Sequence, residues 1–344
     1  KTVDLSSIDV IPAQFFKSCS LLENVTINKC TKICEEAFAD CTALVSITLN
    51  NVTSIGNNAF SGCVSLQNFE ANSVTTIEDN AFSGCVSLQN FEGNSVTTIG
   101  DNTFSGCTAL QTFEANSVTT IDSRTLKNCT ALENVFLNSV TTIGDNAFSG
   151  CTALQTFEAN SITSFDFTIF EGCQNLKNLS FNSLLEFPVD SDGGLNISGI
   201  DNIESFSADS LTVIPDNFLK GKEKLASISF RSAMVVGDYA FYGTALTSVS
   251  LPCATEVGEY SFADCTSLKK ILMSSLPELP LSTLKGSTAL DYVYLSSITE
   301  LPVGADGSTY VSDKPLISAF IVENVTEICG AADKVAYIKR DDKI

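Results

Sequence analysis

The sequence predicts an α/β repeat solenoid, in which short coils of similar sequence stack on one another and share a core. Three periodic columns of residues lead to this prediction. Cysteine recurs every 22 residues through the first half of the chain, phenylalanine keeps the same step, and leucine marks the same place in most copies. Self-similarity with a period of roughly 20 to 50 residues is typical of stacked-repeat proteins, whose single coils cannot bury their own apolar face.

The three columns can be read directly from the chain. The cysteines are Cys19, Cys41, Cys63, Cys85, Cys107, Cys129, Cys151 and Cys173. The phenylalanines are Phe16, Phe38, Phe60, Phe82, Phe104, Phe148 and Phe170, with Leu126 in the remaining place. The leucine-type position recurs at residues 22, 44, 66, 88, 110, 132, 154, 176, 203, 225, 246, 268, 290 and 317. With a partial strand at residues 3–5 and a closing segment at 335–338, we expect roughly sixteen strands in one sheet.

Each repeat is expected to begin with a strand. Residues 110–115 alternate apolar and polar side chains from Phe113 on, as in a strand with one buried face. An Asn-Ser pair then supplies a turn, and residues 118–121 form a second extended segment. The stretch 145–151 is expected to form a short helical turn that carries phenylalanine inward. Stacking pairs each strand with the next, about 4.8 Å away, in a parallel sheet on the concave face of a right-handed curved solenoid.

We expect one solenoid over the whole chain, residues 1–344. Two repeats are longer than the others and carry similar insertions, so the repeats of the first half are regular and some in the second half are interrupted. The expected parts are a partial N-terminal repeat at 1–21, regular repeats at 22–186, repeats at 187–332 with insertions near 188–199 and 302–315, and a C-terminal cap at 333–344.

Charge and composition exclude several classes of function. The chain has 40 acidic and 19 basic residues, a net charge of -21, and no Lys or Arg between residues 33 and 123. Such a surface repels phosphate, so we expect neither nucleic acid nor an anionic membrane as a partner. No apolar run approaches the roughly 18 residues that span a bilayer, so we expect no membrane insertion. Histidine is absent, which excludes histidine-based triads, histidine metal ligands and a histidine pH switch.

One sequence pattern is specific enough to indicate a family. The motif A-F-x-x-C-x-x-L, followed by S-V-T-x-I-G, is similar to the BspA-like subclass of leucine-rich repeats and covers nearly the whole chain. The resemblance implies a leucine-rich-repeat solenoid in a secreted or surface-exposed protein of a bacterium or protist. It also implies adhesion to a host or matrix protein, a role of several members. The chain departs from the family in having Ala-Asn after the strand where Ile-Pro is usual.

Two further columns have a structural and a functional interpretation. The cysteines are expected to be buried, reduced thiols, with disulfides or a metal as the alternatives and Cys30 and Cys34 as exceptions outside the column. Asparagine follows the strand in successive repeats, where an amide ladder can satisfy backbone groups at the turn. A hydrogen-bonding surface for glycans is the alternative. This column contains Asn28, Asn50, Asn72, Asn94, Asn116, Asn138, Asn160 and Asn182.

The concave face supplies the candidate ligand-binding residues, because the outward side chains of its strands do not pack in the core. One group, the acidic stripe, consists of Glu70, Glu92, Glu114 and Glu158. Recent duplication of nearly identical repeats is the alternative explanation for this stripe. A second group, the aromatic patch, consists of Leu272, Tyr292, Tyr294 and Ile321. Large apolar side chains exposed together often mark protein contacts, whereas cover by the 302–315 insertion would make the patch a small second core.

These features favour a binding protein over an enzyme. Catalysis needs a pocket with converging groups of perturbed pKa, whereas this sequence offers a periodic surface with no irregular polar cluster. We therefore expect no catalytic residue, no cofactor and no metal. The expected function is a non-enzymatic, adhesin-like scaffold, secreted or on the cell surface, that recognises a protein ligand. A glycan- or cation-binding module and a passive spacer of a larger surface protein are the alternatives.

Overall fold

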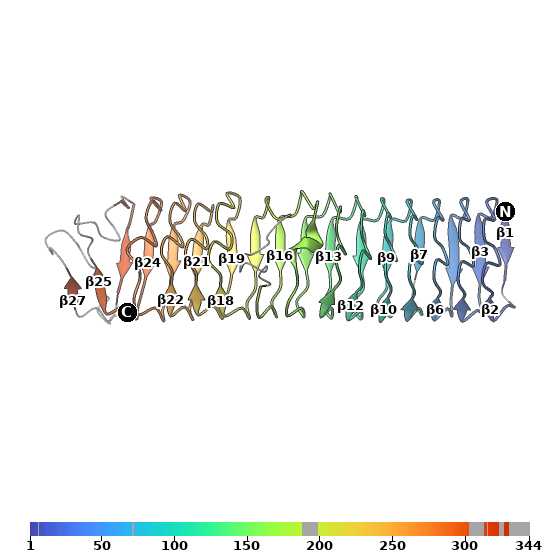
Figure 1. Ribbon diagram of the computed structural model, residues 1–344, viewed down its shortest axis with the longest axis horizontal. Coiled ribbons are helices and arrows are strands. Elements are labelled where there is room, and N and C mark those ends of the chain that lie inside the picture. Colours follow the sequence, from blue (N-terminus) through green and yellow to red (C-terminus); the bar gives the residue numbers. More distant parts are fainter. Residues whose placement is uncertain are drawn as a thin grey trace. The chain divides into compact units, whose positions relative to one another are not determined.

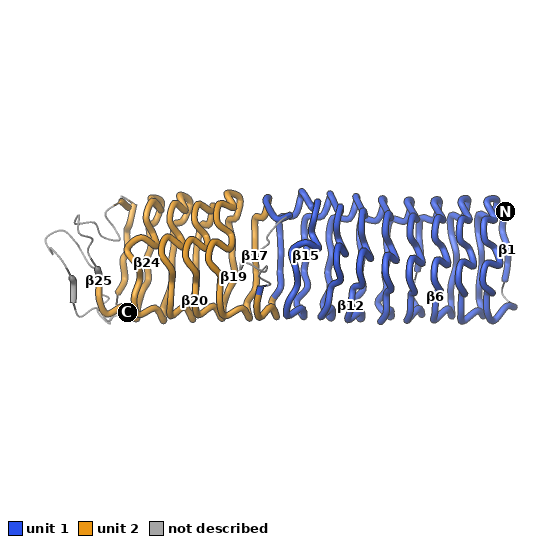
Figure 2. Tube along the Cα trace, viewed as in Figure 1, with its two compact units in different colours: residues 1–181, 187–201 blue, residues 182–186, 202–344 orange. Residues whose placement is uncertain are grey.

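The computed structural model describes residues 1–5, 7–70, 72–187, 199–302, 313–314, 316–322 and 327–329. The chain divides into two compact units: Lys1–Phe181 with Phe187–Asp201, called unit 1, and Asn182–Glu186 with Asn202–Ile344, called unit 2 (Figure 2). Most of the two insertions at 188–199 and 302–315 lies outside the described residues, as does the expected cap at 333–344 with its closing segment at 335–338. The expected division of one solenoid into a partial repeat, regular repeats, repeats with insertions and a cap stays a prediction.

Unit 1 is built from short parallel strands that follow one another coil by coil (Figure 1). Neighbouring strands pair one coil apart, so Phe113 lies beside Phe91 on one side and Val135 on the other. This order confirms the expected parallel sheet of stacked coils. The strands of the sheet in unit 1 are β1 (Thr2–Asp4), β3 (Asn24–Ile27), β5 (Ser46–Leu49), β7 (Asn68–Glu70), β9 (Asn90–Glu92), β11 (Thr112–Glu114), β13 (Asn134–Phe136), β15 (Thr156–Glu158) and β16 (Asn178–Ser180).

Each of these strands buries one face. In β11, Phe113 is buried between the exposed residues Thr112 and Glu114, which is the alternation that the sequence predicts. The strand is shorter than expected at its beginning. The N–H of Leu110 donates to the carbonyl oxygen of Cys107 in its own coil (3.1 Å), so Leu110 belongs to the preceding turn. Its side chain is nevertheless fully buried and contributes to the core.

A second row of two-residue strands confirms the second extended segment of each repeat. Here β12 (Thr120–Ile121) pairs in parallel with β14 (Thr142–Ile143), and Ile121 is buried. The row therefore gives each coil a second set of hydrogen bonds to its neighbours. Its other members in unit 1 are β2 (Val10–Ile11), β4 (Lys32–Ile33), β6 (Ser54–Ile55), β8 (Thr76–Ile77) and β10 (Thr98–Ile99).

The segment that carries the phenylalanine is a series of tight turns rather than the expected helical turn. Asn58 has a left-handed backbone with φ of 55°, and its N–H donates to Asp79 O in the next coil (2.9 Å). The N–H of Phe60 likewise donates to Ala81 O (2.8 Å). Because alternate N–H groups bind the neighbouring coil, too few bonds remain within the segment for a helix. Among the described residues the only helix is η1 (Phe167–Phe170), a 3-10 helix.

Stacked phenylalanine rings form the core of unit 1. The ring centroids of Phe38 and Phe60 lie 5.3 Å apart with their planes 1° apart, and Phe82 and Phe104 repeat this geometry. All four side chains are fully buried. Burial of such a side chain stabilises the fold by roughly 1.5–3 kcal/mol relative to exposure. The prediction that this column is core is confirmed.

Unit 2 continues the same kind of coil. The buried centres of its last strands are Ile271, Val293 and Phe320. Its strands are β17 (Ser205–Ser207) paired with β19 (Ser227–Ser229), and a sheet of β21 (Ser248–Ser250), β23 (Lys270–Leu272), β24 (Tyr292–Tyr294) and β26 (Ala319–Ile321). A second row contains β18 (Val213–Ile214), β20 (Val235–Val236) and β22 (Glu256–Val257), and β25 (Glu300–Pro302) pairs with β27 (Glu327–Cys329). The right hand and the concave placement of the sheet stay predictions.

Candidate ligand-binding surfaces

The strand pairing places three members of the acidic stripe next to one another. Glu92 lies in register with Glu70 on one side and with Glu114 on the other, and all three side chains are exposed. Glu158 is separated from them, because Phe136 stands between Glu114 and Glu158 in the same row. Unit charges at this spacing repel by about 1 kcal/mol in water. The stripe is therefore a row of three carboxylates, an exposed aromatic ring and a fourth carboxylate.

A hollow lies over the first part of the stripe. Its volume is about 380 Å³ and its lining is mostly carboxylate and amide groups. The amide of Asn72 donates to the carboxylate of Glu70 (3.5 Å), which ties the turn to the strand. The two strand asparagines of this hollow were not predicted as site residues, although they stand in an outward column two positions before each glutamate. The lining residues are Asn68, Phe69, Glu70, Asn72, Asn90 and Glu92.

The strand pairing also brings the aromatic patch together in unit 2. Tyr294 on β24 lies in register with Leu272 on β23 and with Ile321 on β26. Tyr292 stands at the other outward position of β24, two residues before Tyr294. All four side chains are half-buried. The four predicted residues thus form one continuous group on three neighbouring strands.

Lys270 is a member of this surface that was not predicted. It pairs with Tyr292 across β23 and β24, and its Nζ lies 5.0 Å from the centroid of the Tyr292 ring. A lysine ammonium at this distance is attracted to the ring face by roughly 0.5–1 kcal/mol at an exposed site. The outward spacing along β23 puts Lys270 in the tyrosine row. The sequence does not show that the side chain bends over the ring.

The described part of the second insertion reaches a turn of unit 2. The carboxylate of Asp313 accepts a hydrogen bond from the N–H of Gly286 (2.7 Å), and Asp313 also pairs with the buried Lys314. The salt bridge and the hydrogen bond both lower the pKa of Asp313 against the opposing effect of burial. Residues 303–312 and 315, on which the alternative of cover over the aromatic patch depends, lie outside the described residues.

The asparagine column forms part of the expected amide ladder. The Nδ2 of Asn50 donates to Oδ1 of Asn28 (2.8 Å), and the Nδ2 of Asn116 donates to Oδ1 of Asn94 (3.2 Å). Asn138 continues the ladder by donating to Asn116 (3.1 Å). Asn72 departs from it, because its amide donates to Glu70. Side-chain bonds between neighbouring coils thus support a structural role for these members, and use of the column in binding glycans stays a prediction.

The cysteine column is structural. The thiol of Cys63 donates to the carbonyl oxygen of Phe38 in the preceding coil (3.1 Å), and the same bond recurs along the column. Burial raises the pKa of the Cys41 thiol to about 11 and that of Cys107 to about 12, which keeps them protonated and unreactive. The cysteines with described side chains are free thiols. Cys30 is buried and donates to Lys32 O (3.0 Å), so it too has a local structural role.

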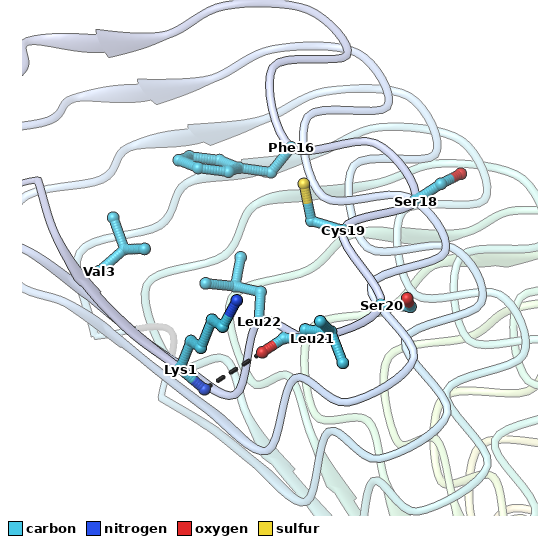
Figure 3. A pocket seen from close by; sticks show the side chains of 8 residues that line it. All are labelled: Lys1, Val3, Phe16, Ser18, Cys19, Ser20, Leu21 and Leu22. Atoms are coloured by element: carbon cyan, nitrogen blue, oxygen red, sulfur yellow. Dashed lines mark hydrogen bonds between the residues drawn. The ribbon is translucent and has the colours of Figure 1, made fainter.

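The first thiol of the column differs from the others. Cys19 is exposed, contrary to the expectation of burial, and it lines a hollow of about 410 Å³ at the first coil of unit 1 (Figure 3). The side chains of Phe16 and Leu22 border the same hollow, and the terminal amino group of Lys1 donates to Leu21 O (3.1 Å) beside it. The lining is therefore mainly apolar, with no second thiol and no acidic group.

Among the described residues, no group of three or more Cys, Asp or Glu side chains is arranged to hold a metal ion. In the same part of the chain, no helix has the length and apolar character needed to cross a membrane.

The chain is similar to a family and to several solved structures. The family described as BspA type leucine-rich repeat region (6 copies) matches over residues 9–133, 75–189 and 198–305. A leucine-rich cell surface protein from Faecalibacterium prausnitzii is 25% identical, with a TM-score of 0.42 over 84% of this chain and 83% of that chain. A leucine-rich repeat protein from Bacteroides ovatus is 24% identical, with a TM-score of 0.48 over 91% and 90%. Among curated proteins, none matches the sequence.

The family matches cover most of the chain, including most of the described coils of both units. They coincide with the parallel strands, the buried phenylalanine and leucine columns and the turns between them. The chain is a leucine-rich-repeat solenoid of parallel strands, and it belongs to the BspA-type leucine-rich repeat family.

Proposed function

We propose that this chain is a non-enzymatic scaffold that binds a protein ligand through the outward side chains of its strands. The observation that carries this proposal is the register of Leu272, Tyr294 and Ile321 on three neighbouring strands, with Tyr292 beside them. Tyrosine is enriched at the centres of protein interfaces, where its ring supplies contact area and its hydroxyl a hydrogen bond.

The core gives no reason for large apolar residues at these positions. The inward residues of the same strands, Ile271, Val293 and Phe320, are already buried and fill the interior. Strands β17, β19 and β21 carry serine at the corresponding outward positions, and these strands fold in the same way. The aromatic patch is therefore an addition to the surface, and recognition of a ligand explains it.

The acidic stripe has a different role in this proposal. Exposed carboxylates attract basic segments of a ligand over a distance and speed its encounter with the surface. Phe136, 38% exposed, interrupts the row and offers an apolar contact beside the charges. A glycan- or cation-binding module is the second candidate function, because the hollow above Glu70 and Glu92 is lined by amides and carboxylates. A passive spacer is the third.

Family membership supports a location on the cell surface or in the secreted fraction, and an adhesin-like role. BspA-type proteins are mostly surface-exposed or secreted, and several adhere to host or matrix proteins. In this proposal the ligand is a host or matrix protein, and neither a nucleic acid nor a cofactor takes part. The net charge of -21 agrees with this choice of partner.

The proposal is tested by binding of the purified chain to arrayed extracellular and host-surface proteins. The variant Tyr292→Ser with Tyr294→Ser is compared with Val213→Ser, which removes another exposed apolar side chain (51% exposed) from the second row of strands. We expect the double variant to lose binding at an unchanged melting temperature, and Val213→Ser to retain binding. A lowered melting temperature with full binding would instead make the aromatic patch a structural element.

A further inference from the structure

Two neighbouring turns of unit 2 carry tyrosine at a position where five other described coils carry asparagine: Asn58, Asn80, Asn102, Asn146 and Asn217. Tyr239 and Tyr260 each stand two residues before a buried phenylalanine, at the place that Asn58 and Asn217 occupy in their own coils. The hydrogen bonds confirm the equivalence. The N–H of Asn217 donates to Asp238 O (2.8 Å), and that of Tyr239 donates to Glu259 O (2.9 Å).

This position requires a left-handed backbone. The φ angles are 55° for Asn58, 56° for Asn217 and 55° for both Tyr239 and Tyr260. Asparagine tolerates this region because its short amide bonds to the local backbone, whereas a bulky side chain there is strained. Such strain persists where the residue serves another purpose, and it concentrates at functional sites. Long polar side chains also occupy this position, at Glu36 (φ 52°) and Arg124 (φ 57°), so the backbone alone does not set the tyrosines apart. Tyr239 and Tyr260 differ from these residues because their rings are in contact from coil to coil.

The tyrosines form an aromatic cluster on the turns, called here the tyrosine platform: Tyr239, Tyr242 and Tyr260. The rings of Tyr239 and Tyr260 are stacked, with centroids 5.0 Å apart and planes 12° apart, and Tyr242 lies 5.8 Å from Tyr239. All three residues are half-buried and therefore partly open to solvent. The hydroxyl of Tyr242 donates to the carboxylate of Asp264, which fixes that ring.

A cation already binds one end of this platform. The Nζ of Lys220 lies 4.4 Å from the centroid of Tyr239 and 5.8 Å from that of Tyr242, and it donates to Oδ1 of Asn217 (3.2 Å). The chain's own lysine thus shows which chemistry the rings attract. The opposite end of the stack is the far face of Tyr260.

The far face of Tyr260 has a small neighbour. The N–H of Phe262 donates to Thr283 O in the next coil (3.1 Å), so Ser282 holds the place that follows Tyr260 in the column. A serine side chain is too small to cover an aromatic ring. Exposed acidic residues are adjacent in sequence to the rings: Asp238 and Glu259 directly precede the two stacked tyrosines. Asp264 accepts a hydrogen bond from the hydroxyl of Tyr242.

We propose that the tyrosine platform is a second binding surface, which takes an arginine side chain from a basic segment of a protein partner. The guanidinium lies flat on the far face of Tyr260 and pairs with the carboxylates beside it. Arginine suits this site because its planar guanidinium stacks on aromatic rings and makes bidentate hydrogen bonds to carboxylates. The platform lies on the turns and not on the strands, so this surface is additional to the aromatic patch and does not depend on it.

The test replaces each stacked tyrosine with asparagine, the residue that other coils carry at this turn position. Tyr239→Asn and Tyr260→Asn leave the charge of the protein unchanged and supply a residue that suits the left-handed backbone. The probe is the blocked peptide Gly-Arg-Gly-Arg-Gly at low salt, followed by NMR of tyrosine rings labelled with carbon-13. We expect saturable shifts of the platform rings, and an affinity roughly two- to fivefold lower in each variant, with a melting temperature equal to or above that of the parent protein.

Two comparisons separate this site from general attraction to an acidic protein. Phe15→Asn, which removes another exposed aromatic ring (54% exposed), should bind the peptide as the parent does. A peptide with glutamine in place of arginine should not shift the platform rings. Unchanged arginine-peptide affinity in Tyr260→Asn would overturn the proposal. So would a lowered melting temperature in both platform variants without loss of affinity, because the tyrosines would then be structural.

Discussion

The thiol of Cys265 and the hydroxyl of Ser287 make equivalent hydrogen bonds in neighbouring coils. Cys265 Sγ donates to Phe241 O (3.2 Å), and Ser287 Oγ donates to Phe262 O (2.7 Å). Both side chains are fully buried, so water does not reach these bonds. Serine can therefore take the place of cysteine, because the position requires a small buried donor to the carbonyl of the preceding coil.

Replacement of a cysteine in the middle of the column should follow the same rule. Cys107 is fully buried and donates to Phe82 O (3.3 Å). We expect Cys107→Ser to change the free energy of unfolding by less than about 1.5 kcal/mol, since the hydrogen bond is kept. Cys107→Leu should lower it by about 1–3 kcal/mol, because the stacked coils leave no room for extra volume. Urea unfolding measures both, and a greater loss for serine than for leucine would contradict the hydrogen-bond explanation.

Stability should fall at alkaline pH because of these thiols. Burial raises the pKa of Cys107 from its ordinary 9.0 to about 12, so the unfolded chain releases this proton at a lower pH than the folded chain. Between these two values the folded state holds more protons, and stability decreases as pH rises through that window. At pH 10 we expect a loss of about 1 kcal/mol for this one thiol. Urea unfolding of the parent and of Cys107→Ser at pH 7 and pH 10 checks this, with a smaller decrease expected for the variant.

Truncation to alanine should lower stability more at a buried phenylalanine than at an exposed one. Phe104 is fully buried in the ring stack, so Phe104→Ala should lower the free energy of unfolding by about 3–5 kcal/mol. Phe136 is 38% exposed on the strand face, and Phe136→Ala should cost clearly less. Thermal or urea unfolding of the two variants measures the two losses. Equal losses would show that Phe136 is held in a core of its own.

The acidic stripe should act on association and not on folding. The triple variant Glu70→Gln, Glu92→Gln and Glu114→Gln removes three exposed carboxylates in register. We expect a melting temperature equal to or slightly above that of the parent, because repulsion of about 1 kcal/mol per neighbouring pair in water is relieved. Binding of a lysine-rich peptide, followed by stopped flow, should begin more slowly and depend less on salt. A faster dissociation with an unchanged association rate would contradict this role, and Glu158→Gln serves as a single-site control.

The repeat period predicts those features that depend on side chains alternating in and out. Phe113 is buried between Thr112 and Glu114 because strands have a period of two, and the pairing of Leu272, Tyr294 and Ile321 follows from the step between coils. The turn around Asn58 was predicted as helical because the spacing of its apolar residues does not reveal where N–H groups point. These groups bind the next coil, which a single repeat does not contain.

Side-chain conformations are the second class of feature that the period does not predict. The step between coils pairs Lys270 with Tyr292 but does not show that the ammonium lies over the ring. The outward columns of the strands do not contain the stacked pair Tyr239 and Tyr260, because these tyrosines lie on turns. In the sequence they are marked by their spacing, which equals that of Asn58 and Asn217 from the core residue two positions later.

The bonds between turns of neighbouring coils have a mechanical consequence. In the described part of unit 1, each inner coil is held by its two neighbours, through strand pairs and through turn bonds such as that of Phe60 N–H to Ala81 O. Tension on one end of this stack therefore detaches coils one at a time, and each frees 22 residues, about 75 Å of extended chain. Force spectroscopy should show equal steps of this length and not one rupture. We expect a solenoid of this construction to lengthen under load by yielding coils at one end, while the coils behind them keep their outward side chains in place.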